Sequence, residues 1–145
     1  RRLGPYAREM ELGTAWPLFV FDPEEETLMG AITLSNIRRG VAETGTLGYW
    51  IGQPHAGQGV GTAAARTMLA SAFEALKLHR VEAACVPGNQ ASRRVLEKAG
   101  FRHEGLAKAY LKINGAWADH LLFGIIRDEH VPDPTASSSY TRESL

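Results

Sequence analysis

The sequence predicts a single α/β (α+β) domain that ends in a β-hairpin. Short apolar, β-branched runs alternate with two helix-patterned segments, Thr62–Leu78 and Asn89–Gly100. The dipeptide Asn114-Gly115 lies between two strand-like runs and is the strongest short signal for a hairpin with a type I′ turn. With 145 residues, of which 44% are apolar and 22% charged, the chain can bury one sizeable core.

The first half of the chain is predicted to hold a helix and three strands. Residues Arg1–Leu12 are rich in helix formers and precede a glycine that would end the helix. Two β-rich runs follow, Leu18–Phe21 and Leu28–Ile37, and the proline and acidic residues between them favour a hairpin connection. A third strand is expected at Thr44–Ile51.

The second half is predicted to alternate helix and strand before the final hairpin. The helix opening at Thr62 has one apolar side, formed by Val60, Ala64, Met68, Leu69, Ala72, Phe73 and Leu76. A short strand is expected at Val81–Val86, where Pro87-Gly88 ends it. Asn89 is placed to cap the next helix, and Gly100 to end it in a left-handed conformation.

Counting outward from the Asn-Gly turn fixes an expected register for the final hairpin, Ala109–Ile113 with Ala116–Ile126. Lys112 then pairs with Trp117, and Tyr110 pairs with Asp119. Alternation of side chains places these four residues on one face. Residues 132–145 hold proline, four serines and few apolar residues, which predicts a flexible tail behind a domain of residues 1–131.

A glycine-rich turn between the third strand and the following helix predicts a phosphate site. Gly57, Gly59 and Gly61 stand at alternate positions and lead into the helix. Glycines let backbone N–H groups gather around an anion, and the first turn of a helix has N–H groups without internal partners. The turn lacks the lysine of a P-loop and the glycine spacing of a dinucleotide fold. A pyrophosphate held by backbone alone remains, and coenzyme A carries one.

These residues resemble the GNAT (GCN5-related) N-acetyltransferases, whose phosphate loop is Arg/Gln-x-x-Gly-x-Gly/Ala. Gly59 and Gly61 match its glycines, whereas Ala56 replaces the usual first residue. The segment from Asn89 to Phe101 resembles the second signature of the family. Glu104-Gly105 and the run from Tyr110 to His120 resemble the RimJ/RimL branch, the ribosomal-protein N-terminal alanine acetyltransferases. The resemblance implies the GNAT acyl-CoA N-acyltransferase fold, with a mixed, mostly antiparallel sheet flanked by helices.

The resemblance also implies where acetyl-CoA lies. Its pantetheine would run beside Tyr49–Ile51, where that strand splays from Val81–Val86, and a strand N–H near Ile51 would face the thioester carbonyl. Asn89 would cap its helix and also bond the pantetheine; a plain cap is the alternative. The expected cofactor-binding residues are Ile51, Gln58, Gly59, Val60, Gly61, Thr62 and Asn89.

Three residues are candidates for the chemistry. Ser92 could donate a hydrogen bond to the leaving thiolate, or it could be an exposed helix serine. Many GNAT enzymes have a tyrosine acid where this chain has Leu96, so Ser92 or water must serve. Asp119 with Tyr110 suits an ammonium site, although a cross-strand hydrogen bond between them is the simpler interpretation.

Other reactive residue types favour structural roles. Cys85, at the end of a strand, is expected to be a buried thiol, because no activating base is evident. Four histidines are expected at surfaces or loop ends, namely His55, His79, His103 and His130. No pair of them has metal-ligand spacing with a nearby carboxylate, so no metal is predicted.

Charge and cysteine content narrow the partners. Sixteen basic residues balance sixteen acidic ones, so no overall field draws the chain to nucleic acid or a membrane. The single cysteine excludes an internal disulfide and is typical of the cytoplasm. A monomer or homodimer is expected. The chain begins at Arg1 without an initiator methionine, and the resemblance implies a further strand and helix ahead of the matching region.

The leading functional hypothesis is an acetyl-CoA-dependent N-acetyltransferase. Its acceptor would be the N-terminal α-amine of a protein, with alanine first, and the resemblance implies a ribosomal protein. A GNAT enzyme for a small amine, such as an antibiotic or a polyamine, is the second hypothesis. The third is a CoA-binding regulatory module without turnover.

Overall fold

The computed structural model describes residues 16–21, 28–51, 59–131 and 141–143. The helix expected at residues 1–12, the connection at 22–27, Gln58 and residues 132–140 lie outside this part of the chain. The elements in chain order are β1 (Trp16–Phe21), β2 (Leu28–Arg38), β3 (Thr44–Ile51), α2 (Val60–Ala70), the π-helix η2 (Ser71–Ala75), β4 (Arg80–Cys85), α3 (Gln90–Ala99), β5 (Arg102–Ile113), β6 (Ala116–Ile126), the 3₁₀ turn η3 (Arg127–Glu129) and β7 (Thr141–Glu143).

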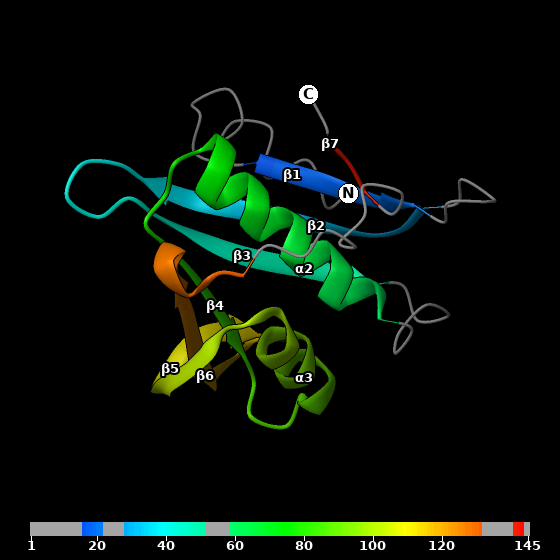
Figure 1. Ribbon diagram of the computed structural model, residues 1–145. Coiled ribbons are helices and arrows are strands. Elements are labelled where there is room, and N and C mark those ends of the chain that lie inside the picture. Colours follow the sequence, from blue (N-terminus) through cyan, green and yellow to red (C-terminus); the bar gives the residue numbers. More distant parts are fainter. Residues whose placement is uncertain (1–15, 22–27, 52–58, 132–140, 144–145) are drawn as a thin grey trace.

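Within the described residues, the strands form one sheet in the order β5-β6-β4-β3-β2-β1-β7. Only β3 and β4 pair in parallel, and α2 is the crossover between them. The other strand pairs are antiparallel. Figure 1 shows α2 lying across β2 and β3, with α3 near the end of the sheet formed by β4, β6 and β5. The predicted mixed, mostly antiparallel sheet with flanking helices is confirmed.

The core lies between the helices and the central strands. The apolar side predicted for the first helix is buried along α2 and η2, at Ala64, Met68, Leu69, Ala72 and Phe73. It packs in one cluster with strand residues that include Ile32, Leu34, Leu47 and Val81. Burial of these side chains is the main favourable term that holds helix and sheet together.

The predicted turn of the final hairpin is confirmed. Asn114 has φ +50° and Gly115 has φ +82°, as a type I′ turn requires, and Ile113 pairs with Ala116. However, β5 begins at Arg102, earlier than the predicted start at Ala109. Strand formation there depends on pairing with the distant β6, which local patterns do not encode.

Residues 141–143, which lie within the predicted tail, are extended in the structure. They form β7, which pairs antiparallel with β1 through Leu18↔Glu143 and Val20↔Thr141. An edge strand such as β1 offers a row of unpaired main-chain groups, and a polar segment can satisfy them without contributing to the core.

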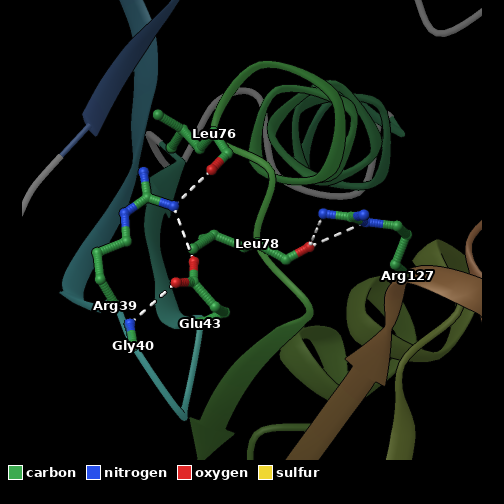
Figure 2. A network of polar contacts seen from close by, with 6 residues as sticks. All are labelled: Arg39, Gly40, Glu43, Leu76, Leu78 and Arg127. Carbon is green, nitrogen blue, oxygen red and sulfur yellow. Dashed lines mark hydrogen bonds and ion pairs between the residues drawn. The ribbon is translucent and has the colours of Figure 1, made fainter.

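Two arginines hold the connection from α2 to β4 (Figure 2). The helix ends in a π-turn, because Leu76 N–H donates to Ser71 O five residues back (3.0 Å). Arg39 donates to Leu76 O (2.5 Å), and Arg127 donates twice to Leu78 O (3.1 and 2.7 Å). Arg39 thus satisfies a carbonyl at the helix end, and Arg127 satisfies one in the connection just ahead of β4.

A second polar cluster links β4, β6 and β5. Arg80 donates to Glu82 (2.9 Å) and forms a two-bond pair with Glu104. This pair keeps the pKa of Glu104 below its usual value, and hydrogen bonding to Glu104 raises that of Arg80. The guanidinium passes over Gly124, where a Cβ would lie 2.6 Å from Arg80 Nη2. Gly124 therefore makes room for an ion pair that spans three strands.

We expect Gly124→Ala to lower the free energy of unfolding by about 1 kcal/mol, because the new methyl group displaces the Arg80 guanidinium from Glu104. Denaturant unfolding of four proteins measures this: wild type, Gly124→Ala, Arg80→Ala and the double variant. When Arg80 is already alanine, adding Gly124→Ala should lower the free energy of unfolding by little. An equal cost in both backgrounds would contradict the assignment.

The difference in unfolding free energy between wild type and Gly124→Ala should also depend on pH. The folded-state pKa of Glu104 is lowered, so its ion pair stabilises the fold above the ordinary carboxylate range and loses that contribution as the pH falls through the folded pKa. The gap between wild type and Gly124→Ala should therefore narrow in acid.

Candidate active site

The central feature of the candidate site is the separation of β3 from β4. Their parallel ladder covers Thr44↔Arg80, Gly45↔Val81 and Thr46↔Glu82. Beyond it, β3 continues to Ile51 in register with β2, whereas β4 continues to Cys85 in register with β6. Each strand stays paired on its outer side, so the two inner edges diverge. The splay expected from the resemblance is present.

The N-terminus of α2 has main-chain donors without partners inside the helix. Gly59 is the N-cap residue, with φ +79° and an exposed surface, and no side chain caps this helix. The first intrahelical bond runs from Ala63 N to Gly59 O (3.1 Å). The N–H groups of the preceding first-turn residues, Val60, Gly61 and Thr62, have no carbonyl to reach within the helix. The predicted helix start at Thr62 is two residues late, and the difference places Gly61 inside this first turn.

Both predicted caps of α3 are confirmed. Asn89 Oδ1 accepts a hydrogen bond from the Ser92 N–H (3.1 Å), the usual N-cap arrangement. Gly100 ends the helix with φ +108°, and its N–H and that of Phe101 bond to Glu97 O and Leu96 O. Ser92, in the first turn, is half-buried.

Cys85 ends β4 as a buried thiol, 7% exposed. Burial raises its pKa. Cys85 belongs to one buried cluster with Leu96 and Ala99 of α3, which places the thiol on the side of the sheet that α3 covers. Leu121, its partner on β6, shares that side. The prediction of a buried thiol is confirmed.

The pairing predicted between Tyr110 and Asp119 is wrong. Three pairs next to the turn match the prediction, as far as Leu111↔Ala118, but the next pair is Ala107↔His120. The three intervening residues of β5, residues 108–110, therefore face Asp119 alone in a β-bulge. Asp119 Oδ1 accepts the N–H of Ala109 (2.8 Å), and Ala109 has φ +48°. The carboxylate fixes the bulge rather than bonding across to a paired tyrosine.

The bulge brings Tyr110 to His120, a residue that sequence reasoning had passed over. Their ring centroids are 5.7 Å apart, with a tilt of 53°. His120 is 4% exposed, and its Nδ1 lies 3.0 Å from the carbonyl oxygen of Ala118. Alternation alone had placed Tyr110 with Asp119, and no local signal in the sequence marks a bulge of this length.

The remaining histidines are not gathered at the site. His79 and His103 are exposed, as predicted, and His55 lies outside the described residues. His130 is half-buried instead, with its ring 5.4 Å from that of Phe73, and burial lowers its pKa. Across residues 16–21, 28–51, 59–131 and 141–143, the His, Cys, Asp and Glu side chains form no group of three suited to a metal ion.

Comparison with known proteins identifies the family. The family model of the acetyltransferase (GNAT) domain matches residues 3–102, well over half of the chain. The chain belongs to the GNAT acetyltransferase family. This family uses acetyl-CoA as its acetyl donor, and the coarse assignment as an N-acetyltransferase follows from it.

Relatives are found among proteins of several names. A probable N-acetyltransferase YjcK of Bacillus subtilis is 39% identical over 129 residues, which are 89% of this chain and 71% of that protein. The ribosomal protein uS5 alanine N-acetyltransferase of Escherichia coli is 34% identical over 131 residues, 90% of this chain and 68% of that protein.

Solved structures agree with the fold. RimJ of Mycobacterium smegmatis in complex with CoA-disulfide has a TM-score of 0.79 at 39% identity over 93% of this chain, which spans 62% of the RimJ chain. A ribosomal-protein alanine acetyltransferase from Vibrio fischeri has a TM-score of 0.78 at 37% identity, over 90% of this chain and 72% of that one. Among the helices described here, none is long and apolar enough to cross a membrane.

We expect Asp119→Ala to open the bulge of β5. Removing the carboxylate leaves the Ala109 N–H without its acceptor, and the positive φ of Ala109 then lacks support. Amide hydrogen exchange by NMR should show faster exchange at Ala109 by at least tenfold, with the amides of the Asn114-Gly115 turn unchanged. Asp119→Asn keeps an oxygen acceptor and is the matched control. Retained protection in Asp119→Ala would show that the bulge does not depend on this carboxylate.

Proposed function

We propose that this protein transfers acetyl from acetyl-CoA to the N-terminal α-amine of a protein, with alanine favoured at the first position. The observation that carries the proposal is the divergence of β3 from β4 directly before the uncapped N-terminus of α2. Two relatives whose names specify ribosomal-protein alanine acetyltransferases support the acceptor class. A ribosomal protein is accordingly the proposed natural target.

The proposed cofactor path follows main-chain donors. The pyrophosphate binds the N–H groups of residues 58–62 at the positive end of the α2 dipole. The pantetheine runs into the gap between β3 and β4, where the Ile51 N–H polarises the thioester carbonyl. Asn89 contacts the pantetheine from the opposite side. None of these contacts requires a metal ion.

Three side chains take part in the proposed chemistry. Ser92, beside the capped start of α3, donates to the thiolate as it leaves. Tyr110 offers its ring and hydroxyl to the incoming amine. Asp119 belongs to the same amine site, where it holds the bulge that presents Tyr110.

The charge state of the acceptor favours an α-amine. An α-amino group titrates near pH 8 and a lysine side chain near 10.4. At pH 7 roughly a tenth of the α-amine is already neutral, against less than about a thousandth of the lysine. The described part of the site has few carboxylates to hold a polycation, which favours a monoamine over a polyamine.

We expect Gly59→Val to abolish CoA binding, because the side chain occupies the anion position and opposes the positive φ. Gly40→Val is a matched control: Gly40 has φ +78° against +79° for Gly59, both have open space around a new Cβ, and Gly40 lies at the other end of β3. Both variants should lose similar thermal stability. Only Gly59→Val should lose CoA affinity by calorimetry. Equal CoA affinity in both would place the pyrophosphate elsewhere.

We expect peptides that begin with alanine to be acetylated on the α-amine. The test uses peptides beginning Ala, Ser or Leu, each with one internal lysine, and mass spectrometry to locate the acetyl group. Ala should react fastest and Leu slowest, and added spermidine should not compete. Acetylation on lysine or spermidine alone would reject the α-amine assignment while leaving the family and cofactor intact.

A further inference from the structure

The described structure holds one buried, fixed imidazole that the proposed reaction does not yet use. His120 lies on β6, 4% exposed, with its ring against Tyr110. Its Nδ1 lies 3.0 Å from the carbonyl oxygen of Ala118. A carbonyl only accepts hydrogen bonds, so Nδ1 carries the proton. Neutral imidazole has one N–H, and Nε2 is therefore left with a lone pair that can accept a proton.

The strand register places His120 level with the gap between the ends of β3 and β4. Thr46 pairs with Glu82, so Trp50 of β3 is level with Val86, the residue after β4. Cys85 pairs with Leu121, so His120 is also level with Val86. The end of β3 therefore lies on one side of the end of β4, and His120 lies on the other side, at the same position along the strands. Neighbouring strands are about 4.8 Å apart, which puts His120 one strand beyond the gap.

Strand alternation places His120 on the face opposite α3. Leu121 shares the α3 side with Cys85, and its neighbour His120 points to the other face because side chains alternate along a strand. Gly124, four residues further along, has the same parity as His120, and the Arg80–Glu104 pair crosses it. A ligand between β3 and β4 can therefore be approached by an acceptor from the His120 face while α3 occupies the other.

We propose that His120 is the general base of the acetyl transfer. The acceptor arrives as an ammonium and gives one proton to His120 Nε2. The neutral amine attacks the thioester carbon, the C–N bond forms and the C–S bond breaks. The second proton of the attacking nitrogen goes to the departing thiolate by way of Ser92, and the imidazolium returns its proton to water. The products are the amide, CoA thiol and one proton.

This inference rests on the proposed function only in requiring an amine acceptor. Tyr110 on β5 contacts the His120 ring, and Lys108 belongs to the same bulge of β5. Asp119 lies on the same strand as His120, and its carboxylate holds the bulge. On β4, Cys85 is turned to the α3 side, and Glu82 lies further along with Arg80 and Glu104.

The test is His120→Asn, whose amide nitrogen can still donate to Ala118 O but which has no counterpart of Nε2. We expect kcat/KM for an alanine peptide at pH 7 to fall by about a hundredfold or more. CoA affinity and the melting temperature should stay close to wild type. The loss should shrink as the pH rises above about 8, where the α-amine arrives neutral. His103→Asn, an exposed histidine on β5, is the matched control and should behave as wild type.

Several outcomes would overturn the inference. One is an unchanged kcat/KM in His120→Asn at pH 7. The other is a fall in kcat/KM by the same factor at every pH, which would indicate that the His120 ring has only a structural role. Should that variant fail to fold, nitrogen NMR of histidine-labelled wild type decides instead: a proton on Nε2 and none on Nδ1 would reject the base.

Failure of the proposed acceptor is distinguishable from failure of this inference. If wild type acetylates lysine or spermidine and no α-amine, the comparison of His120→Asn with His103→Asn is repeated on that amine. The pH at which the variant recovers should then move up with the pKa of the new acceptor. A recovery that stays near pH 8 would contradict the role of His120.

Discussion

The main-chain junction between the start of β3 and the start of β4 is the constraint on which the candidate site depends. Glu43 O accepts the N–H groups of both His79 (2.8 Å) and Arg80 (3.2 Å), which joins the two parallel strands at one end. Beyond this junction, β3 stays paired with β2, and β4 stays paired with β6. The inner ladder between β3 and β4 stops after three pairs, while the two outer ladders continue.

Side chains reinforce that junction from both sides, as Figure 2 shows. Glu43 accepts from Arg39 and from the Gly40 N–H, while Arg127 holds Leu78 O just ahead of β4. Arg39 and Arg127 come from segments far apart in the sequence, and both bond the short connection behind α2. The closed end of the two strands is thus fixed, and the position of α2 is fixed with it. The proposed cofactor site lies at the open end, where the two strands diverge.

The sequence predicted what local chemistry decides. The Asn-Gly turn, the Asn89 cap, the Gly100 stop and the bounds of β3 depend on a few adjacent residues, and each was confirmed. The cofactor, and the glycines that we propose to bind its pyrophosphate, followed from the same kind of local pattern. Pairing between strands was beyond such patterns: the early start of β5 and the strand at residues 141–143 depend on partners further away in the chain, and the bulge depends on the Asp119 carboxylate of the facing strand. His120 was not predicted as a site residue, since strand alternation grouped Tyr110 with Asp119 and only the bulge brings Tyr110 against the His120 ring.

The state of Cys85 has a practical consequence for measuring turnover. Every acetyl transfer from acetyl-CoA releases a free thiol, which a chromogenic disulfide reagent can count continuously. The protein has one cysteine, and that thiol is 7% exposed with a raised pKa, so little of it is present as the reactive thiolate at neutral pH. The folded enzyme therefore contributes almost no background to such an assay. A sudden gain of protein-derived signal would instead report that β4 has come away from α3.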